Sequence, residues 1–202
     1  MIINNNKLLF IHIPKCGGSS LSLLLNKYRV ESHYKHCGHS NYVEYENRIG
    51  RDIDNYKIFT IVRNPWAWHV SWFHYLKGIE PRMHGHHIEH KLFNGKDFDF
   101  NNYIDWLIDE KQQKSSQNFI IRNQYDWCIN NDGVFKVDHI LRLENLTHDF
   151  NEFCEKYDIV DDTLLKINAS KHNHYKSYYE PETIKIIADR HEKDLTKFNY
   201  VY

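Results

Sequence analysis

The sequence predicts an α/β protein in which helices flank a central sheet of parallel strands. Two apolar runs, residues 7–13 and 57–62, have the length and composition of buried strands. Each run leads into a segment with helix start signals, and a third strand candidate, 137–143, precedes an amphipathic helix at 147–157. Strands that alternate with helices indicate parallel pairing, because each helix returns the chain to the start of the next strand.

Capping residues and hydrophobic periodicity place the other elements. Ser19 or Ser20 can N-cap a leucine-rich helix, and Pro65 begins a helix that runs to Gly78. Further helices are expected at 41–49, 100–110, 117–128 and 181–198, the last of them after the start signal Glu180-Pro181-Glu182. Residues 79–98 have no clean period, so we expect a long loop there.

Length and composition limit the class of protein. The 202 residues suit a single domain, assigned to 1–202. A formal net charge of -1 gives no broad surface for nucleic acid. The four cysteines form no Cys-x-x-Cys pair, which indicates reduced thiols rather than a zinc ribbon. Without a signal peptide or an apolar run of roughly 20 residues, we expect a soluble, cytoplasmic or otherwise intracellular protein that does not bind membranes.

Residues 14–20, Pro-Lys-Cys-Gly-Gly-Ser-Ser, predict an anion-binding turn between the first strand and its helix. Glycines let backbone N–H groups approach an anion, and the following helix N-terminus adds a positive dipole end. Lys15 adds a mobile positive charge. The order differs from Walker A, in which the lysine follows the glycines. An ordinary strand-turn-helix connection with a solvated lysine is the alternative.

A second segment predicts a contact to another anionic group. Arg63 directly follows the strand 57–62, and the carboxyl ends of strands are where α/β sheets bind ligands. An arginine there suits a bidentate contact to phosphate. Ser71 lies about two turns into the next helix and could face the same pocket. In the alternative interpretation Arg63 is a cap and Ser71 bonds to its own helix backbone.

Together the two segments resemble the 5′-phosphosulfate loop and 3′-phosphate motif of sulfotransferases that use 3′-phosphoadenosine 5′-phosphosulfate (PAPS). The carbohydrate-type family is most similar: its first motif reads His-Ile-Pro-Lys-Thr-Gly-Gly-Thr/Ser-Ser and its second reads Val-Arg-Asn-Pro followed by a serine. This chain has Cys16 where threonine is usual. The resemblance continues at His39-Ser40, Leu141-Arg142-Leu143-Glu144-Asn145-Leu146, 168–182 and 194–200.

The resemblance implies a three-layer, P-loop-like fold and in-line transfer of a sulfuryl group from PAPS to a hydroxyl of a carbohydrate, with no metal required. Lys15 would contact the bridging oxygen of the leaving nucleotide, while Arg63 and Ser71 would hold the 3′-phosphate. The 5′-phosphosulfate would be held by Cys16, Gly17, Gly18, Ser19 and Ser20. At Cys16 the backbone N–H would contact the 5′-phosphosulfate, because a thiol replaces the usual hydroxyl.

The acceptor hydroxyl needs a general base, and histidine suits this role because its pKa lies near 6.5. His39 matches the family's histidine between the first helix and the second strand. His36 is the next candidate, followed by His33. His12 lies in a predicted buried strand, so we expect a hydrogen-bonded core residue there.

Two histidine-rich segments have less specific interpretations. His84, His86, His87 and His90 could ligate a metal, but Pro81 and Gly85 interrupt a helix there, which favours a loop on the acceptor side. The basic cluster at 171–176 could reach the nucleotide or form a solvated loop.

Two other functions stay open. A P-loop-like nucleotide kinase would bind ATP with magnesium, although the position of Lys15 argues against it. A non-catalytic module would bind nucleotide or glycan on the same fold without transferring a group.

Overall fold

The structure is a computed structural model that describes residues 2–3, 7–25, 39–78, 99–109, 119–159 and 172–202. The chain divides into two compact units, and each is assembled from two stretches of sequence. The first comprises Met1–Asn64 and Asn123–Ala169, and the second comprises Pro65–Arg122 and Ser170–Tyr202. The assignment of 1–202 to a single domain stays a prediction.

In the described residues, the first unit contains a four-stranded sheet with the strand order β1-β2-β3-β4. The strands are β1 Ile2–Ile3, β2 Leu8–Ile11, β3 Lys57–Val62 and β4 His139–Arg142. β2 and β3 pair in parallel with Leu9 opposite Ile58, and β3 and β4 pair in parallel with Ile61 opposite Leu141. The three predicted strands and their parallel pairing are thereby confirmed. The short β1 was not predicted, and it pairs antiparallel with β2.

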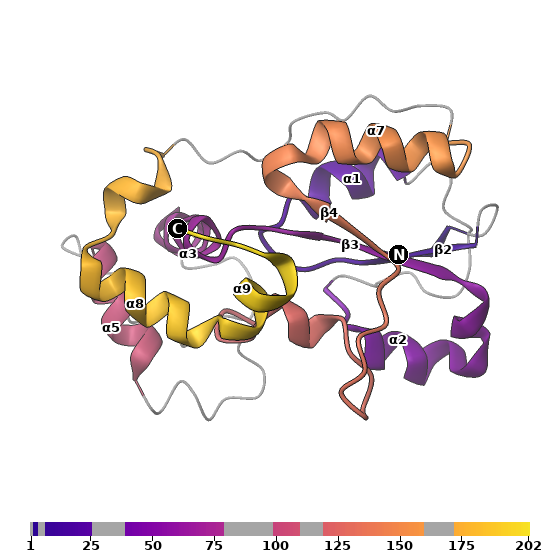
Figure 1. The fold of residues 1–202 in the computed structure, drawn as a ribbon, viewed down its shortest axis with the longest axis horizontal. Coiled ribbons are helices and arrows are strands. Elements are labelled where there is room, and N and C mark those ends of the chain that lie inside the picture. Colours follow the sequence, from indigo (N-terminus) through magenta and orange to yellow (C-terminus); the bar gives the residue numbers. More distant parts are fainter. Residues whose placement is uncertain (1, 4–6, 26–38, 79–98, 110–118, 160–171) are drawn as a thin grey trace. The chain divides into compact units, whose positions relative to one another are not determined.

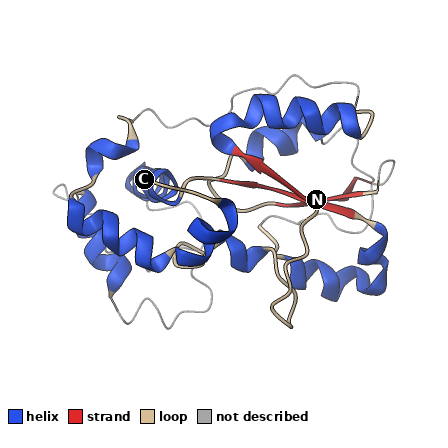
Figure 2. Ribbon diagram, in the orientation of Figure 1, coloured by secondary structure: helices blue, strands red, loops and turns tan. Residues whose placement is uncertain are grey.

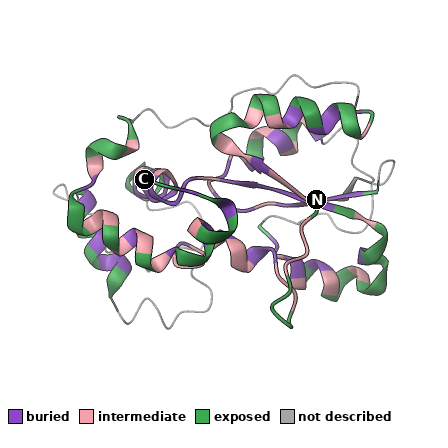
Figure 3. Cartoon of the chain, viewed as in Figure 1, coloured by how far each residue is buried: buried purple, intermediate pink, exposed green. Residues whose placement is uncertain are grey.

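Helices cover both faces of this sheet, as predicted for an α/β protein (Figure 1). Helices α1 Gly18–Leu25 and α7 Leu146–Lys156 lie on one face, and α2 Tyr42–Ile49 lies on the other. Because helices cover both faces, the central strands are buried on each side (Figure 3). Phe10, Phe59 and Phe150 are fully buried where β2, β3 and α7 contribute to the core.

The described part of the second unit is helical (Figure 2). Its elements are α3 Pro65–Gly78, α5 Phe100–Ile108, η5 Tyr175–Tyr178, α8 Pro181–Arg190 and α9 Glu192–Phe198. Helix α3 contacts α5, η5 and α8. Four of its aromatic residues, Trp66, Trp68, Trp72 and Phe73, are buried, whereas Tyr75 is exposed. No helix within the described ranges is long and apolar enough to cross a membrane.

Three helix predictions need correction. α1 begins at Gly18, directly after the turn at Gly17, so neither Ser19 nor Ser20 is its N-cap. The described part of 117–128 forms only the 3₁₀ helix η3 Gln124–Trp127, closed by a hydrogen bond from the Cys128 N–H to the Tyr125 carbonyl. The predicted helix 181–198 is two helices, because the chain leaves the helical path at His191.

Candidate active site

The carboxyl ends of the parallel strands bring two of the predicted anion-binding residues, Lys15 and Arg63, together in the first unit. The loop after β2 carries Lys15, and Arg63 directly follows β3. Arg63 Nη1 donates a hydrogen bond to the Lys15 carbonyl oxygen at 3.2 Å. After β4 comes the 3₁₀ helix η4 Leu143–Asn145, whose Glu144 Oε1 accepts a hydrogen bond from the Asn64 N–H at 2.7 Å.

The turn at 14–18 is tightly built around its two glycines. Gly17 has φ +78°, and a Cβ there would lie 2.6 Å from Leu143 Cδ1. A Cβ on Gly18 would lie 2.1 Å from His12 Cδ2, which leaves no room for a side chain. Lys15 also adopts a positive φ, 62°, which is uncommon for a residue other than glycine. The turn therefore has a sterically restricted conformation that depends on both glycines.

Lys15 lies in a partly buried, cationic setting. Burial, with the nearby Arg63 guanidinium as the second cause, lowers the pKa of Lys15 to about 8, against a smaller opposing effect of Cys16. Lys15 therefore carries its proton at pH 7, but its pKa lies closer to 7 than the pKa of an exposed lysine does. A bound anion would raise the pKa of Lys15 again, because an opposite charge favours the protonated form.

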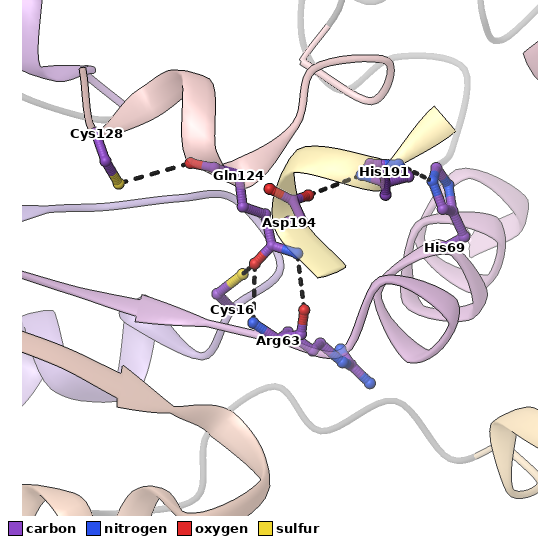
Figure 4. Close-up of polar contacts among 7 residues, drawn as sticks. All are labelled: Cys16, Arg63, His69, Gln124, Cys128, His191 and Asp194. Atoms are coloured by element: carbon purple, nitrogen blue, oxygen red, sulfur yellow. Dashed lines mark hydrogen bonds and ion pairs between the residues drawn. The ribbon is translucent and has the colours of Figure 1, made fainter. Parts of the chain in front are cut away.

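Cys16 points into the protein at this turn. Its side chain is buried, and Sγ donates a hydrogen bond to Gln124 Oε1 at 3.3 Å (Figure 4). The thiol therefore has an internal hydrogen-bond partner. Sequence reasoning missed Gln124, because no motif marks it and it is 61 residues from Arg63 in the chain.

His39 and His12 form a pair beside the turn. Their ring centroids are 4.4 Å apart, and His39 Nδ1 lies 3.2 Å from the His12 carbonyl oxygen. A carbonyl oxygen only accepts, so this contact places a proton on Nδ1 of the exposed His39 and makes Nε2 the basic nitrogen. Burial, with His39 as the second cause, lowers the pKa of His12 to about 3. The alternative base, His36, lies outside the described residues, as does His33.

The prediction for His12 needs correction. β2 ends at Ile11, so His12 lies between the strand and the turn, and it is half-buried rather than a core residue. Its ring occupies the space above Gly18. The residue therefore shapes the start of α1.

The comparison with protein families decides the identity. A model of the sulfotransferase family matches residues 1–201. The chain belongs to this sulfotransferase family. The resemblance to sulfotransferases is thereby confirmed, and the protein is a transferase of sulfuryl groups. A search of curated proteins found no match.

The two residues expected to hold the 3′-phosphate lie in different units of the sulfotransferase. Arg63 is half-buried in the first unit, and Ser71 is buried in α3 of the second, with 4% of its surface exposed. Their joint contact with one phosphate stays a prediction. In the predicted basic cluster, His172 stacks on His74 with ring centroids 5.0 Å apart, whereas Lys171 lies outside the described residues.

The second unit of the sulfotransferase also contains a buried polar network that the sequence did not reveal (Figure 4). His69 Nε2 and His191 Nε2 are 2.7 Å apart, and His191 Nδ1 donates to Asp194 Oδ2 at 2.8 Å. His69 Nδ1 lies 2.7 Å from the Tyr103 hydroxyl. Burial, with additional effects of His191 and Arg190, holds the pKa of His69 well below its usual value. The network links α3, α5 and α9.

The metal interpretation of the histidine-rich segment falls outside what the structure describes. His84, His86, His87 and His90 all lie in the range 79–98. In the described ranges, the histidines, cysteines and carboxylates form no cluster of three or more that could hold a metal ion.

Proposed function

We propose that this sulfotransferase moves a sulfuryl group from PAPS to a hydroxyl group of a carbohydrate acceptor. The observation that supports this most is the hydrogen bond from Arg63 to the Lys15 carbonyl, because it holds two cationic residues at one edge of the sheet. PAPS carries anionic groups at both its 5′ and 3′ ends and supplies an activated sulfuryl group when bound. Two neighbouring cations match a ligand with two anionic groups better than they match a single phosphate ion.

The turn from Lys15 to Ser20 would hold the 5′-phosphosulfate. The N-terminus of α1, which begins at Gly18, adds a positive dipole end. The Cys16 thiol is engaged with Gln124, so Cys16 would contribute through its backbone N–H. Ser19 is exposed and Ser20 half-exposed, and their hydroxyl groups would donate to the same oxygens.

Lys15 would neutralise the charge that develops on the bridging oxygen of the leaving nucleotide. Sulfuryl transfer resembles phosphoryl transfer, in which positioning and electrostatics supply most of the catalysis. The pKa of about 8 keeps the ammonium form available at neutral pH. The proposed mechanism assigns this neutralisation to Lys15 and includes no metal ion. Arg63 and Ser71 would hold the 3′-phosphate, which orients the nucleotide for in-line transfer.

His39 would accept the proton of the acceptor hydroxyl. Its contact with the His12 carbonyl holds the proton on Nδ1, so Nε2 is the nitrogen that takes up the new proton. The low pKa of His12 keeps the neighbouring ring neutral, which avoids a second positive charge beside the base. His36 is the alternative base.

A transfer assay tests the proposal. Purified protein is incubated with sulfur-labelled PAPS and a panel of desulfated glycans, and incorporated label is measured for three proteins. We expect label on at least one glycan with the wild type, none with Lys15→Ala, and unchanged incorporation with Lys156→Ala, an exposed lysine at the end of α7. Wild-type transfer rates in Lys15→Ala would overturn the proposed role of Lys15. Phosphate transfer from ATP with magnesium would support the kinase instead.

A further inference from the structure

We infer that Gln124 is a positioning residue that fixes Arg63 and the donor-binding turn relative to each other. The inference rests on the proposed function, in which both bind the same nucleotide. The inference also assigns a role to Cys16, because its thiol is one of the groups that Gln124 holds in place.

The side-chain amide of Gln124 contacts both elements at once (Figure 4). Its Oε1 accepts hydrogen bonds from the Arg63 N–H at 2.8 Å and from Cys16 Sγ at 3.3 Å. Its Nε2 donates to the Arg63 carbonyl at 2.7 Å. The amide therefore pairs with both the N–H and the carbonyl of Arg63, as a neighbouring strand would. Its Oε1, which accepts from the Arg63 N–H, also contacts the turn at Cys16.

Gln124 is itself held firmly, so it can position other groups. The residue is fully buried and begins η3. Its carbonyl lies 3.6 Å from the Cys128 thiol, which donates to it, and the Cys128 carbonyl accepts from the Lys136 N–H at 2.8 Å. A buried amide whose polar groups are bonded at both ends has little freedom to move.

Only an amide of this length satisfies all three contacts. A carboxylate would turn an oxygen toward the Arg63 carbonyl, and two acceptors cannot bond to each other. A thioether of similar length would leave the Arg63 N–H and carbonyl without this partner in a buried site. We therefore expect Gln124→Met to loosen the Arg63 side chain as well as the turn.

The test is a double-mutant cycle that joins Gln124→Met with Arg63→Ala. The Kd values of adenosine 3′,5′-bisphosphate and of 5′-AMP are measured by calorimetry for the wild type, both single variants and the double variant. We expect Gln124→Met to lower the preference for the bisphosphate by about tenfold, because the Arg63 backbone loses two hydrogen bonds. In that background, Arg63→Ala should change the preference less than about twofold, because coupled residues are not additive.

Two results contradict the inference and are distinguishable. If Arg63→Ala lowers the preference equally in both backgrounds, Gln124 does not position Arg63, although the proposed function stands. If Arg63→Ala leaves the wild-type preference unchanged, the 3′-phosphate role of Arg63 fails and the inference fails with it.

If Gln124→Met does not fold, a second pair of variants tests whether Gln124 holds the turn. Cys16→Ala removes the bond from the turn to Gln124 and leaves Arg63 paired with the amide. We expect it to weaken 5′-AMP and the bisphosphate by the same factor of several-fold, since the loss affects the 5′ end alone. Cys16→Ser should restore the affinity by supplying a hydroxyl donor. Wild-type affinity in Cys16→Ala would show that Gln124 does not hold the turn.

Discussion

The imidazole of His12 occupies the space in which a side chain on Gly18 would begin. A Cβ on Gly18 would lie 2.1 Å from Cδ2 and 2.3 Å from Nε2 of the ring. Gly18 is also the first residue of α1. The histidine and the glycine therefore fix where the helix starts, and with it the direction of the N–H groups proposed to bind the donor.

Gly18→Ala should destabilise the protein by about 1–3 kcal/mol, the usual cost of forcing atoms into a packed site. Denaturant unfolding measures this cost. Gly78→Ala is the matched control, because a Cβ there meets nothing within 4 Å. In the double variant with His12→Ala, most of the loss from Gly18→Ala should disappear. An equal cost for Gly18→Ala and Gly78→Ala would show that the ring does not restrict this site.

Donor affinity should depend on pH through Lys15. Because the pKa of Lys15 is about 8 without ligand, the free protein loses this proton as the pH rises through 8. Binding of the bisphosphate should weaken over this range, by at most about tenfold per pH unit for one proton. Lys15→Arg should bind without this fall, because arginine stays protonated. The same fall in Lys15→Arg, measured by calorimetry, would assign the titration to another group.

Acid should destabilise the second unit through His69. The pKa of His69 lies well below 6.5 in the folded protein, whereas the unfolded chain takes up a proton near pH 6.5. The unfolded state thus binds more protons as the pH falls, so the free energy of unfolding decreases below pH 6.5, by up to about 1.4 kcal/mol per pH unit. His191, Asp194, Tyr103 and Arg190 surround the ring, and burial remains the largest cause.

His69→Gln should therefore show a shallower decrease in the free energy of unfolding between pH 7 and pH 5 than the wild type. Denaturant unfolding at several pH values gives both slopes. His148→Gln, at a side chain that is 63% exposed on α7, is the control for replacing a histidine outside this network. A wild-type slope in His69→Gln would contradict the role assigned to burial.

Replacement of His39 should slow the chemical step. His39→Ala should lower the single-turnover rate by about 10²–10⁴-fold, the usual contribution of a general base. The bisphosphate affinity should stay within about twofold, because a general base acts on the acceptor hydroxyl. His148→Ala serves as the control. If His39→Ala keeps the full rate across pH 6–8, the base lies elsewhere and His36 is the next residue to test.

Sequence patterns predicted the elements whose residues are close neighbours in the chain. The apolar run of 57–62 gave the bounds of β3, and Pro65 and Gly78 marked both ends of α3. The meeting of the turn and Arg63 followed from a general property of parallel sheets, in which the carboxyl ends of strands share one edge.

Long-range contacts explain what the sequence could not predict. Gln124 lies in a segment without a motif, and its role depends on contacts across 61 and 108 residues of chain. His191 interrupts an otherwise continuous helical pattern, because its buried ring bonds to Asp194 and His69. β1 has only two residues, too few to show a period.

The binding of adenosine 3′,5′-bisphosphate tests the central claim most directly. Calorimetry compares this ligand with 5′-AMP and with ATP and magnesium, on the wild type, on Arg63→Ala, and on Arg51→Ala, an exposed arginine in η2 Gly50–Asn55. The account predicts that the wild type and Arg51→Ala bind the bisphosphate most tightly, and that Arg63→Ala loses its preference for the bisphosphate over 5′-AMP. Equal affinity of the wild type for the bisphosphate and 5′-AMP, or tightest binding of ATP with magnesium, would contradict it.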